Sequence, residues 1–487
     1  MSNKKGALLT EEQRLEKALT KKKRRKIALK IFIGFLVILA LFVGITTMIS
    51  VIGVQSNINK AHNYGSAGCA QLEYSVEDNG YVNIKSDKGL KVMQLTDVHI
   101  GGGWMSIKKD AMAINTVATM IRVEKPDFVV VTGDISYPVP FQAGTFNNKS
   151  GAKIFAELME TLGVYWTLAY GNHDTEAYSY YTREQLTDFY RSEQYKHCLL
   201  QPGPEDVDGV GNQVINIVNS DGVITRALIT LDSHSYIDGD VLGIRWLYDN
   251  IHENQINWYK NVVLDLAKRN QDAAKALPAA KQKSYAELEK VVPTSVFFHF
   301  PMEEYRLAWT EYVENDYKDT KNVKYRYGLP GESGKVVYCG IHPDQLFETM
   351  QELGSTDSTF CGHDHYNNFS LNYKGINLTY GYSIDYLAYV GAAAPSWTTT
   401  KTVAWISTRR IIIRTSTRIT PVSPLPCRRS PPPDCRCWTH DNVSFTHCRF
   451  LPTVRIFCCF LAIALWIIGF FMKNFEILLT NGKNLLK

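Results

Sequence analysis

The sequence predicts an α/β fold, a mixed β-sandwich flanked by helices, with a transmembrane helix in front of it. From residue 91 onward, apolar runs of strand length alternate with segments of helical spacing, and two hairpins are interspersed among them. Hydrophobic residues make up 45% of the 487 residues, enough for a packed core. The net charge of +5 is small for this length and does not indicate nucleic-acid binding.

The N-terminal end has the pattern of an uncleaved signal anchor. Residues 1–30 are basic and include KKKRRK at 21–26, and residues 31–54 contain no charge, which is long enough to span a bilayer. The alternatives are a buried core helix or a cleaved signal peptide, but the run is long for a signal peptide and lacks a cleavage pattern. The positive-inside rule predicts a single-pass protein with its N-terminus in the cytoplasm and the rest outside it.

The elements that follow can be placed in order along the chain. Residues 55–90 are polar and predict a stalk with an edge hairpin, and the main domain is expected over residues 91–395. Strands are expected at 91–96, 127–133, 164–171 and 294–300, helices at 108–125, 151–163, 253–270 and 342–355, and hairpins at 213–232 and 369–382. Residues 301–340 are expected to form a rim over the site.

The pattern changes abruptly near residue 395. Residues 396–455 are basic and of low complexity, and only Asp434 and Asp441 are acidic between residues 396 and 473. A second hydrophobic segment follows at 456–472 and is just long enough to cross a membrane. The tail is either a native low-complexity extension with a second anchor or the product of a shifted reading frame, and the abruptness favours the frameshift.

Polar side chains gather where the predicted strands end. If these strands are parallel, their carboxyl ends meet at one edge of the sheet, where α/β proteins bind ligands. Carboxylates, an amide and imidazoles together suit Mn, Fe or Zn rather than a metal that prefers thiolates. They are too many for one tetrahedral ion but enough for two ions that share a carboxylate. Gly133 and Gly171 are expected to let the backbone approach this cluster closely. The residues are Asp97, His99, Asp134, Asn172, His173, His299, His363 and His365.

The motifs DVH, GD, GNHD, H and GHDH, in this order, resemble the signature of the calcineurin-like metallophosphoesterases over about residues 91–390. The strings HFPMEEY and GSTDSTFCGHDHYNNF are similar to the branch related to purple acid phosphatases. The resemblance implies two metal ions with Asp134 bridging them and a metal-bridging hydroxide that attacks phosphorus. It assigns Asp97, His99, Asp134 and His365 to one ion, and Asp134, Asn172, His299 and His363 to the other.

The resemblance also suggests roles for the neighbouring residues. His173 would be catalytic, as a donor to the phosphoryl oxygens or to the leaving group. Asp174 and Asp364 are expected to orient adjacent groups, and His234 to bond locally. Tyr137 stands at the spacing at which purple acid phosphatases supply a tyrosinate to iron, but the presence of His99 favours the histidine as ligand. Some relatives place an aspartate where this chain has Tyr137, which leaves the proton relay around His173 open.

Taken together, these features predict a membrane-anchored hydrolase of phosphate mono- or diesters. One alternative is a non-catalytic binding or receptor module on the same fold. Another is a defective product, because relatives close the sandwich with a further strand that residues 396–455 do not resemble, and an open sheet edge is destabilising. The sequence leaves the substrate, the identity of the metals and the oligomeric state undetermined.

Overall fold

The computed structural model describes residues 10–240, 242–332, 334, 337–389 and 405–406. Of the described residues, those from Ile38 onward form one compact unit, and residues 10–37 fall into a second one. In the second unit the described residues are almost entirely the first part of helix α1 (Glu11–Tyr64). The sheets and all other helices belong to the first unit.

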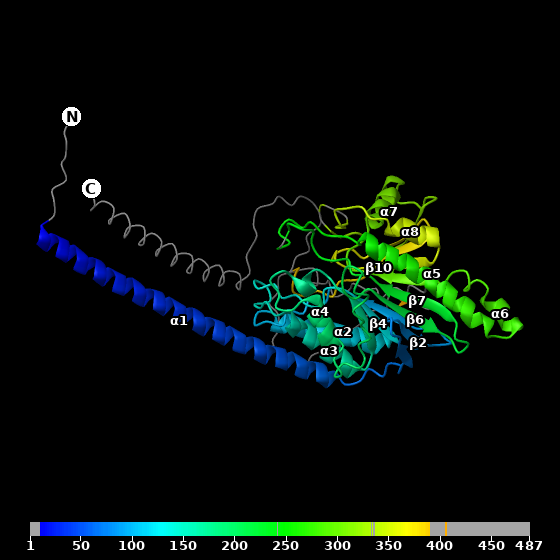
Figure 1. The fold of residues 1–487 in the computed structure, drawn as a ribbon, viewed down its shortest axis with the longest axis horizontal. Helices are drawn as coiled ribbons and strands as arrows, with labels where there is room; N and C mark the ends of the chain where they lie inside the picture. The colour runs from blue at the N-terminus through cyan, green and yellow to red at the C-terminus, as the bar shows by residue number, and fades with distance from the viewer. Residues whose placement is uncertain (1–9, 241, 333, 335–336, 390–404, 407–487) are drawn as a thin grey trace, which may run out of the picture. The chain divides into compact units, whose positions relative to one another are not determined.

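The first unit is built on two β-sheets, as the predicted sandwich requires (Figure 1). The smaller sheet has four strands in the order β13 (Trp405–Ile406), β3 (Val92–Leu95), β4 (Phe128–Thr132) and β5 (Tyr165–Ala169). The larger sheet has nine strands, in the order β1 (Tyr74–Val76), β2 (Val82–Lys85), β6 (Gln213–Val218), β7 (Ile224–Thr230), β8 (Thr294–Phe297), β10 (Thr356–Cys361), β12 (Ile376–Tyr380), β11 (Ser370–Tyr373) and β9 (Val323–Tyr327).

The two sheets share a buried apolar layer, to which Phe128 and Val130 contribute from the smaller sheet and Ile215 and Phe297 from the larger. The outer face of the smaller sheet packs against α2 (Ile107–Glu124), α3 (Asn148–Leu162) and α4 (Arg183–Tyr190). The outer face of the larger sheet packs against α5 (Glu253–Lys275), α7 (Glu303–Glu314) and α8 (Leu346–Leu353). The central strands are therefore covered on both faces, which explains why β4 and β5 are buried along their whole length.

Strand direction brings the polar motifs together. In the smaller sheet β3, β4 and β5 are parallel, and in the larger sheet β7, β8, β10 and β12 are parallel. The motif residues Asp97, Asp134, Asn172, His299 and His363 each follow the carboxyl end of one of these parallel strands. The predicted convergence at one edge is therefore what the topology produces.

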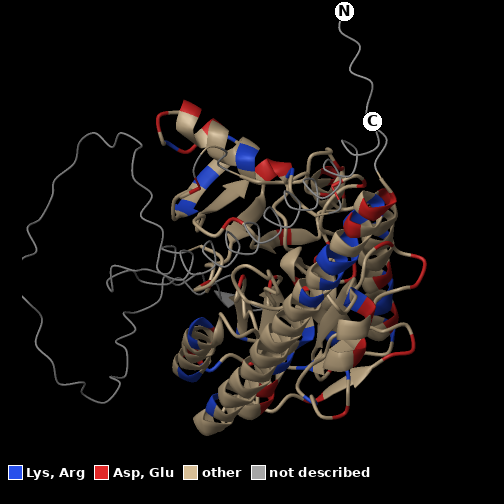
Figure 2. Cartoon of the chain, turned by 90° about the vertical axis from the view of Figure 1, so that its left-hand side faces the viewer, with Lys and Arg blue, Asp and Glu red and all other residues tan. Residues whose placement is uncertain are grey.

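Helix α1 is longer than the predicted transmembrane segment at both ends. It begins at Glu11 and continues to Tyr64, so residues 55–64, which were expected to belong to a polar stalk, are helical. The sequence between Lys30 and Lys60 contains no Lys, Arg, Asp or Glu, and in Figure 2, where Lys and Arg are blue and Asp and Glu are red, long stretches of helix are drawn in tan. By length and composition the helix is able to cross a membrane, and its most apolar window is not buried. The edge hairpin expected after it is formed by β1 and β2.

Other boundaries differ from the prediction. Helix α8 begins at Leu346 rather than near residue 342, and the helix expected at 253–270 continues to Lys275 and is followed by α6 (Ala279–Tyr285). The expected rim at 301–340 contains the helix α7 and the edge strand β9.

The tail contributes one element that the sequence did not suggest. Trp405 and Ile406 form β13, which pairs antiparallel with Met93 and Val92 of β3. The expectation that residues 396–455 supply no closing strand is therefore wrong for these two residues. The hydrophobic segment 456–472 and the rest of the tail lie outside the described residues.

Candidate metal centre

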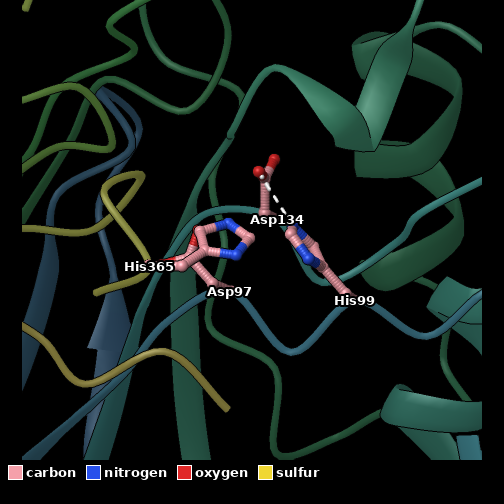
Figure 3. Close-up of side chains that lie close together, drawn as sticks. All are labelled: Asp97, His99, Asp134 and His365. Atoms are coloured by element: carbon pink, nitrogen blue, oxygen red, sulfur yellow. Dashed lines mark hydrogen bonds and ion pairs between the residues drawn. The ribbon is translucent and has the colours of Figure 1, made fainter. Parts of the chain in front are cut away.

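Four side chains from three strand ends meet in a buried cluster. Asp97 and His99 follow β3, Asp134 follows β4 and His365 follows β10, and one ligand atom from each lies within 4.8 Å of the others (Figure 3). The His99 Nε2 atom lies 3.1 Å from Asp134 Oδ2, and His365 Nε2 lies 3.4 Å from Asp97 Oδ1. This is the set that the sequence assigned to one ion.

A second group shares Asp134 with the first. The Asp134 Oδ2 atom lies 3.3 Å from His299 Nε2, which in turn lies 3.2 Å from Asn172 Oδ1. The imidazole of His363 is edge-on to that of His299, with ring centroids 5.3 Å apart. The backbone N–H of His363 donates to the carboxylate of Asp97. All seven predicted metal residues thus occupy one edge, and Asp134 lies between the two groups.

The donor set fits a pair of metal ions. Bonds of 2.0–2.2 Å place neighbouring ligand atoms about 3–3.5 Å apart, the range of separations found here. The electrostatics of the cluster also favour bound cations, because the buried carboxylates stabilise positive charge beside them. Burial lowers the pKa of His99 and His299, yet Asp385 and Asp134 raise that of His99 to about 10, and Asp134 and Asp97 raise that of His299 to about 9. Protons on these imidazoles neutralise charge that bound cations would otherwise balance.

The backbone at the cluster is in a conformation that ordinary residues rarely adopt. The φ angles of Asp97, His99, Asp134 and His363 are 48°, 51°, 56° and 72°. Non-glycine residues with positive φ are uncommon, and such strain concentrates at functional sites. The strained turns lie directly after β3, β4 and β10, where they turn the motif side chains toward one another.

Two glycines make room for the cluster, as the sequence predicted. A Cβ atom on Gly133, whose φ is +90°, would lie 2.4 Å from Nδ1 of His299. A Cβ atom on Gly171 would lie 2.2 Å from Oδ1 of Asp134. Both distances are far below contact, so any side chain at either position would displace a residue of the cluster.

Asp174 is a buried connector between two motif loops. One carboxylate oxygen accepts the N–H groups of Asp134 and Gly171, and the other accepts the N–H of Ser136, each at 2.9 Å. Burial and the neighbouring Asp134 raise the pKa of Asp174 to about 6. The side chain holds the backbone on which Asp134 stands and does not join the cluster itself.

Asp364 has a similar position on the other side. Its Oδ2 atom accepts the hydroxyl of Tyr380 at 2.6 Å and the N–H of Tyr338 at 3.2 Å. Burial raises the pKa of Asp364 to about 7. These bonds fix the loop between His363 and His365.

Tyr137 contacts the cluster through its ring rather than its oxygen. The ring centroid lies 4.7 Å from those of both His99 and His173, while the hydroxyl donates to Oε1 of Gln142. Burial raises the pKa of Tyr137 far above its usual value, which keeps the phenol neutral. The geometry therefore favours His99 over a tyrosinate as the metal-facing group.

His173 is positioned by a residue that the sequence did not single out. The backbone N–H of His173 donates to Asp134 Oδ1 at 2.8 Å, and the ring Nδ1 atom lies 2.6 Å from Oε1 of Glu176. The same Glu176 oxygen accepts the hydroxyl of Tyr236 at 3.3 Å. The imidazole of His173 is 24% exposed, whereas the Glu176 side chain is 4% exposed. Glu176 is thus a buried carboxylate beside His173, in a chain that has none at Tyr137, and it lies three residues after His173 in the sequence.

Asp385 is the second residue that sequence reasoning missed. Its carboxylate lies between two imidazoles, with Oδ1 3.3 Å from His99 Nδ1 and Oδ2 3.4 Å from His365 Nδ1. Neither contact has the angles of a good hydrogen bond, so both are ion-pair contacts. Burial would raise the pKa of Asp385, but the two histidines hold it well below its usual value. Asp385 does not follow a strand end, and nothing in its local sequence distinguishes it.

A separate group of potential ligands lies away from this centre. His234, Asp249 and His252 have ligand atoms within 4.8 Å of one another. The His234 Nε2 atom bonds to Gln255 at 2.9 Å, and the His252 Nδ1 atom bonds to Asp208 at 2.8 Å. Local hydrogen bonds and ion pairs therefore account for these side chains.

Comparisons with known proteins agree with this geometry. Residues 90–367 match the family model described as calcineurin-like phosphoesterase. Probable inactive purple acid phosphatase 28 of Arabidopsis thaliana is 24% identical over 342 residues, which cover 65% of this chain and 75% of that protein. Probable inactive purple acid phosphatase 29 of the same plant is 27% identical, covering 61% and 72%. Phosphatase DCR2 of Saccharomyces cerevisiae is 28% identical, covering 59% and 46%.

Proposed function

The chain belongs to the calcineurin-like phosphoesterase family, and from this premise we propose that it hydrolyses phosphate mono- or diesters with two bound metal ions. The observation that carries the proposal is the position of Asp134. Its Oδ2 atom lies 3.1 Å from His99 Nε2 and 3.3 Å from His299 Nε2, so one carboxylate faces both groups of donors. A shared carboxylate is what a two-metal site requires.

Each of the two groups of side chains is proposed to hold one metal ion. Asp97, His99, Asp134 and His365 would hold one ion, and Asp134, Asn172, His299 and His363 the other. When bound, two ions would polarise the phosphoryl oxygens and lower the pKa of the attacking water. Mn, Fe and Zn all suit this set of oxygen and nitrogen donors.

The protein's own contribution to the reaction centres on His173. Its imidazole is partly exposed at the edge of the buried cluster and is oriented by Glu176, while the backbone N–H of His173 donates to Asp134. From there it would donate a hydrogen bond to a phosphoryl oxygen or a proton to the departing alkoxide. Asp174 and Asp364 hold the loops on which the ligands stand and would keep the site in shape before substrate arrives.

We also propose that helix α1 anchors the protein in a membrane. The uncharged stretch between Lys30 and Lys60, with its basic run at 21–26, supports a single span with a cytoplasmic N-terminus. The metal centre would then face away from the cytoplasm.

The competing function is that of a non-catalytic binding module. The names of two relatives include the words probable inactive, and this observation supports the alternative. A module that only binds has no need for a complete donor set, whereas this chain places all seven predicted ligands at one edge.

One experiment separates the two functions. The full chain, purified in detergent and loaded with Mn, Fe or Zn, is assayed on an aryl phosphate monoester and an aryl phosphate diester. Hydrolysis is expected to disappear on chelation and in Asp134→Ala, and to persist in Asp272→Ala, which removes an exposed carboxylate on α5. Activity that survives both chelation and Asp134→Ala would exclude the two-metal mechanism. Absence of activity in a folded, metal-loaded chain would favour the binding module.

A further inference from the structure

An exposed aromatic surface lies beside the point where α1 meets the folded domain. We call it the aromatic patch and define it as Phe42, Trp104, Phe141, Phe146 and Tyr180. Phe141 and Tyr180 are each 65% exposed, Phe42 is 45% exposed and Phe146 is 41% exposed. The ring of Phe146 stacks on that of Tyr180, and the ring of Phe42 meets that of Trp104 edge-on at 6.3 Å. Gly144, which lies between Phe141 and Phe146 in the sequence, packs against Trp104, so this loop joins the two aromatic pairs. Exposed apolar side chains that gather in this way indicate a partner.

Helix α1 is fastened to the domain along its last turns. Gly53 is buried against Ile107, whose side chain would lie 2.5 Å from a Cβ atom placed on that glycine. The side chain of Asn57, also buried, donates to the backbone oxygen of Ile107 at 3.0 Å. Further along, Tyr64 donates to Asn115 of α2 at 3.0 Å. These contacts set where the domain sits along the helix.

This attachment limits which part of α1 is free to lie in lipid. Phe42 is twelve residues before Val54, so about 18 Å of helix separate them. If residues 31–54 all lay in hydrocarbon, Trp104 would be buried deep in the bilayer together with the folded domain that surrounds it. A span of about 20 residues that ends near Thr46 avoids this. Lys30 would then lie inside the span and reach the cytoplasmic headgroups through its long side chain.

With the span in that place, the aromatic patch falls at the outer boundary of the bilayer. Phe42, four residues before Thr46, and Trp104 beside it would lie within about 6 Å of the headgroup level, near which Trp and Tyr are enriched in membrane proteins. The first turn of α2 adds Lys108, which is exposed and suited to anionic headgroups.

The patch is also directly connected to the metal centre. The indole of Trp104 packs on Gly144, whose Cβ position is 2.5 Å from Nε1. In the same loop, Gln142 accepts the hydroxyl of Tyr137, whose ring contacts His99 and His173. One side chain thus separates the patch loop from the residues proposed to bind and protonate the substrate.

From these contacts we propose that the aromatic patch is a membrane-contact surface, so that the metal centre takes phosphate esters carried by lipids of the same bilayer. The inference rests on the proposed function, both for the membrane anchor and for the hydrolysis. A lipid phosphate would keep its acyl chains in the membrane while its head group enters the site past the patch. Aromatic side chains in the headgroup region would hold the domain at a fixed height above the bilayer.

Photocrosslinking of the full chain in phosphatidylcholine vesicles tests the contact surface. Benzoylphenylalanine replaces Phe141, Phe146, Ile38 in α1, or Leu264 on α5, which is an exposed apolar control at 54% exposure. Lipid adducts are expected at positions 38, 141 and 146 and absent at 264. Adducts at 38 without adducts at 141 and 146 would overturn the contact surface and leave the anchor intact. No adduct at 38 would overturn the anchor and this inference together, and crosslinks from 141 to a second copy of the chain would replace the bilayer by self-association.

Hydrolysis in the same vesicles tests the substrate class. The double variant Phe141→Ser with Phe146→Ser is compared with the unmodified chain on dioleoyl phosphatidate in the vesicles and on a soluble aryl phosphate. The rate on phosphatidate is expected to fall roughly tenfold or more, since two aromatic anchors are lost, while the rate on the soluble ester stays the same. An unchanged ratio of the two rates would overturn the lipid assignment. No hydrolysis of either ester by the unmodified chain would count against the proposed function, and the crosslinks would still decide the contact surface.

Discussion

Individual side chains decide how firmly the metal ligands are held, and Asp385 is the clearest case. Its two carboxylate oxygens face the Nδ1 atoms of His99 and His365, while its backbone neighbours donate to the same group. A histidine that binds metal through one nitrogen is usually fixed by a carboxylate at the other, which sets its tautomer and its basicity. One residue here serves two of the proposed ligands.

Replacing Asp385 with Asn or Ala is therefore expected to weaken metal binding by about 10- to 100-fold. Ala should have the larger effect, since Asn keeps an oxygen that one of the two imidazoles can use. Metal affinity is measured by titration of the chelated protein, and the stoichiometry shows whether one or both ions are affected. The matched control is Asp357→Asn, which removes a carboxylate that pairs with Arg226 on the larger sheet. Equal affinities in Asp385→Ala and the unmodified chain would contradict the role.

Glu176 offers a second prediction, which separates positioning from metal binding. In Glu176→Gln and Glu176→Ala the imidazole of His173 loses its charged partner, so kcat is expected to fall about tenfold or more. Metal content should stay unchanged, because Glu176 bonds to His173 and Tyr236 and to none of the proposed ligands. Steady-state kinetics and metal analysis on the same samples check this. Loss of metal in the variant, or a change confined to KM, would argue against it.

At the scale of secondary structure, the sequence predicted the strands and the residues at their ends well. Asp97, Asp134 and His299 each follow a predicted strand, and parallel strands carry such residues to one edge whatever the details of packing. Local pattern is enough for this because strand length and polarity are local properties. Glu176 and Asp385 lie in loops whose path depends on tertiary contacts, so no periodic pattern points to them.

Two other features could not be predicted from local sequence patterns, for the same reason. The positive φ angles of Asp97, His99 and Asp134 arise because the sandwich closes around them, and non-glycine residues give no sign of such a conformation. Strand β13 consists of two residues whose pairing with Met93 and Val92 is a long-range contact. Its sequence context is basic and of low complexity, which predicts no strand.

The first turn of helix α2 contains a buried acid, Asp110, which holds the loop that leads into the helix and whose titration can be measured. Asp110 accepts the N–H groups of Gly101 and Gly102 at 2.8 and 3.0 Å, and burial raises the pKa of its carboxyl to about 7. An unfolded aspartate has a pKa near 3.9. Between these values the folded form keeps its proton while the unfolded form releases it, so raising the pH favours unfolding.

The stability of the chain is accordingly expected to fall between pH 4 and 7 by up to roughly 4 kcal/mol from this one group. The variant Asp110→Asn lacks the group and should show a flatter dependence of the unfolding midpoint over that range. Thermal unfolding at several pH values compares the two chains, with Asp127→Asn as a control at an aspartate outside this loop. Parallel curves for Asp110→Asn and the unmodified chain would mean that Asp110 is ionised in the folded state throughout.

At the scale of the whole molecule, the end of α1 is part of the folded domain and not a tether. Ile58 and Ala61 are 3% and 0% exposed and belong to the apolar cluster formed with α2 and α3. The same helix that is proposed to cross the bilayer therefore completes the outer layer of the smaller sheet. If α1 crosses a membrane as proposed, one element would set both the membrane position and the stability of the domain, and the patch around Trp104 would have a fixed height relative to the span.

This arrangement predicts that the domain needs residues 55–64 to be stable. A chain that begins at residue 65 loses the burial of Ile58 and Ala61, worth about 3 kcal/mol, and exposes the faces of α2 and α3 beneath them. Denaturant unfolding should show a lower midpoint for this chain than for one that begins at residue 55. Within the longer chain, Ile58→Ala should lower the midpoint and Asn59→Ala, at an exposed position, should not. Equal midpoints for the two truncations would mean that the helix end rests on the domain without stabilising it, and the fixed height of the aromatic patch would then lose its structural basis.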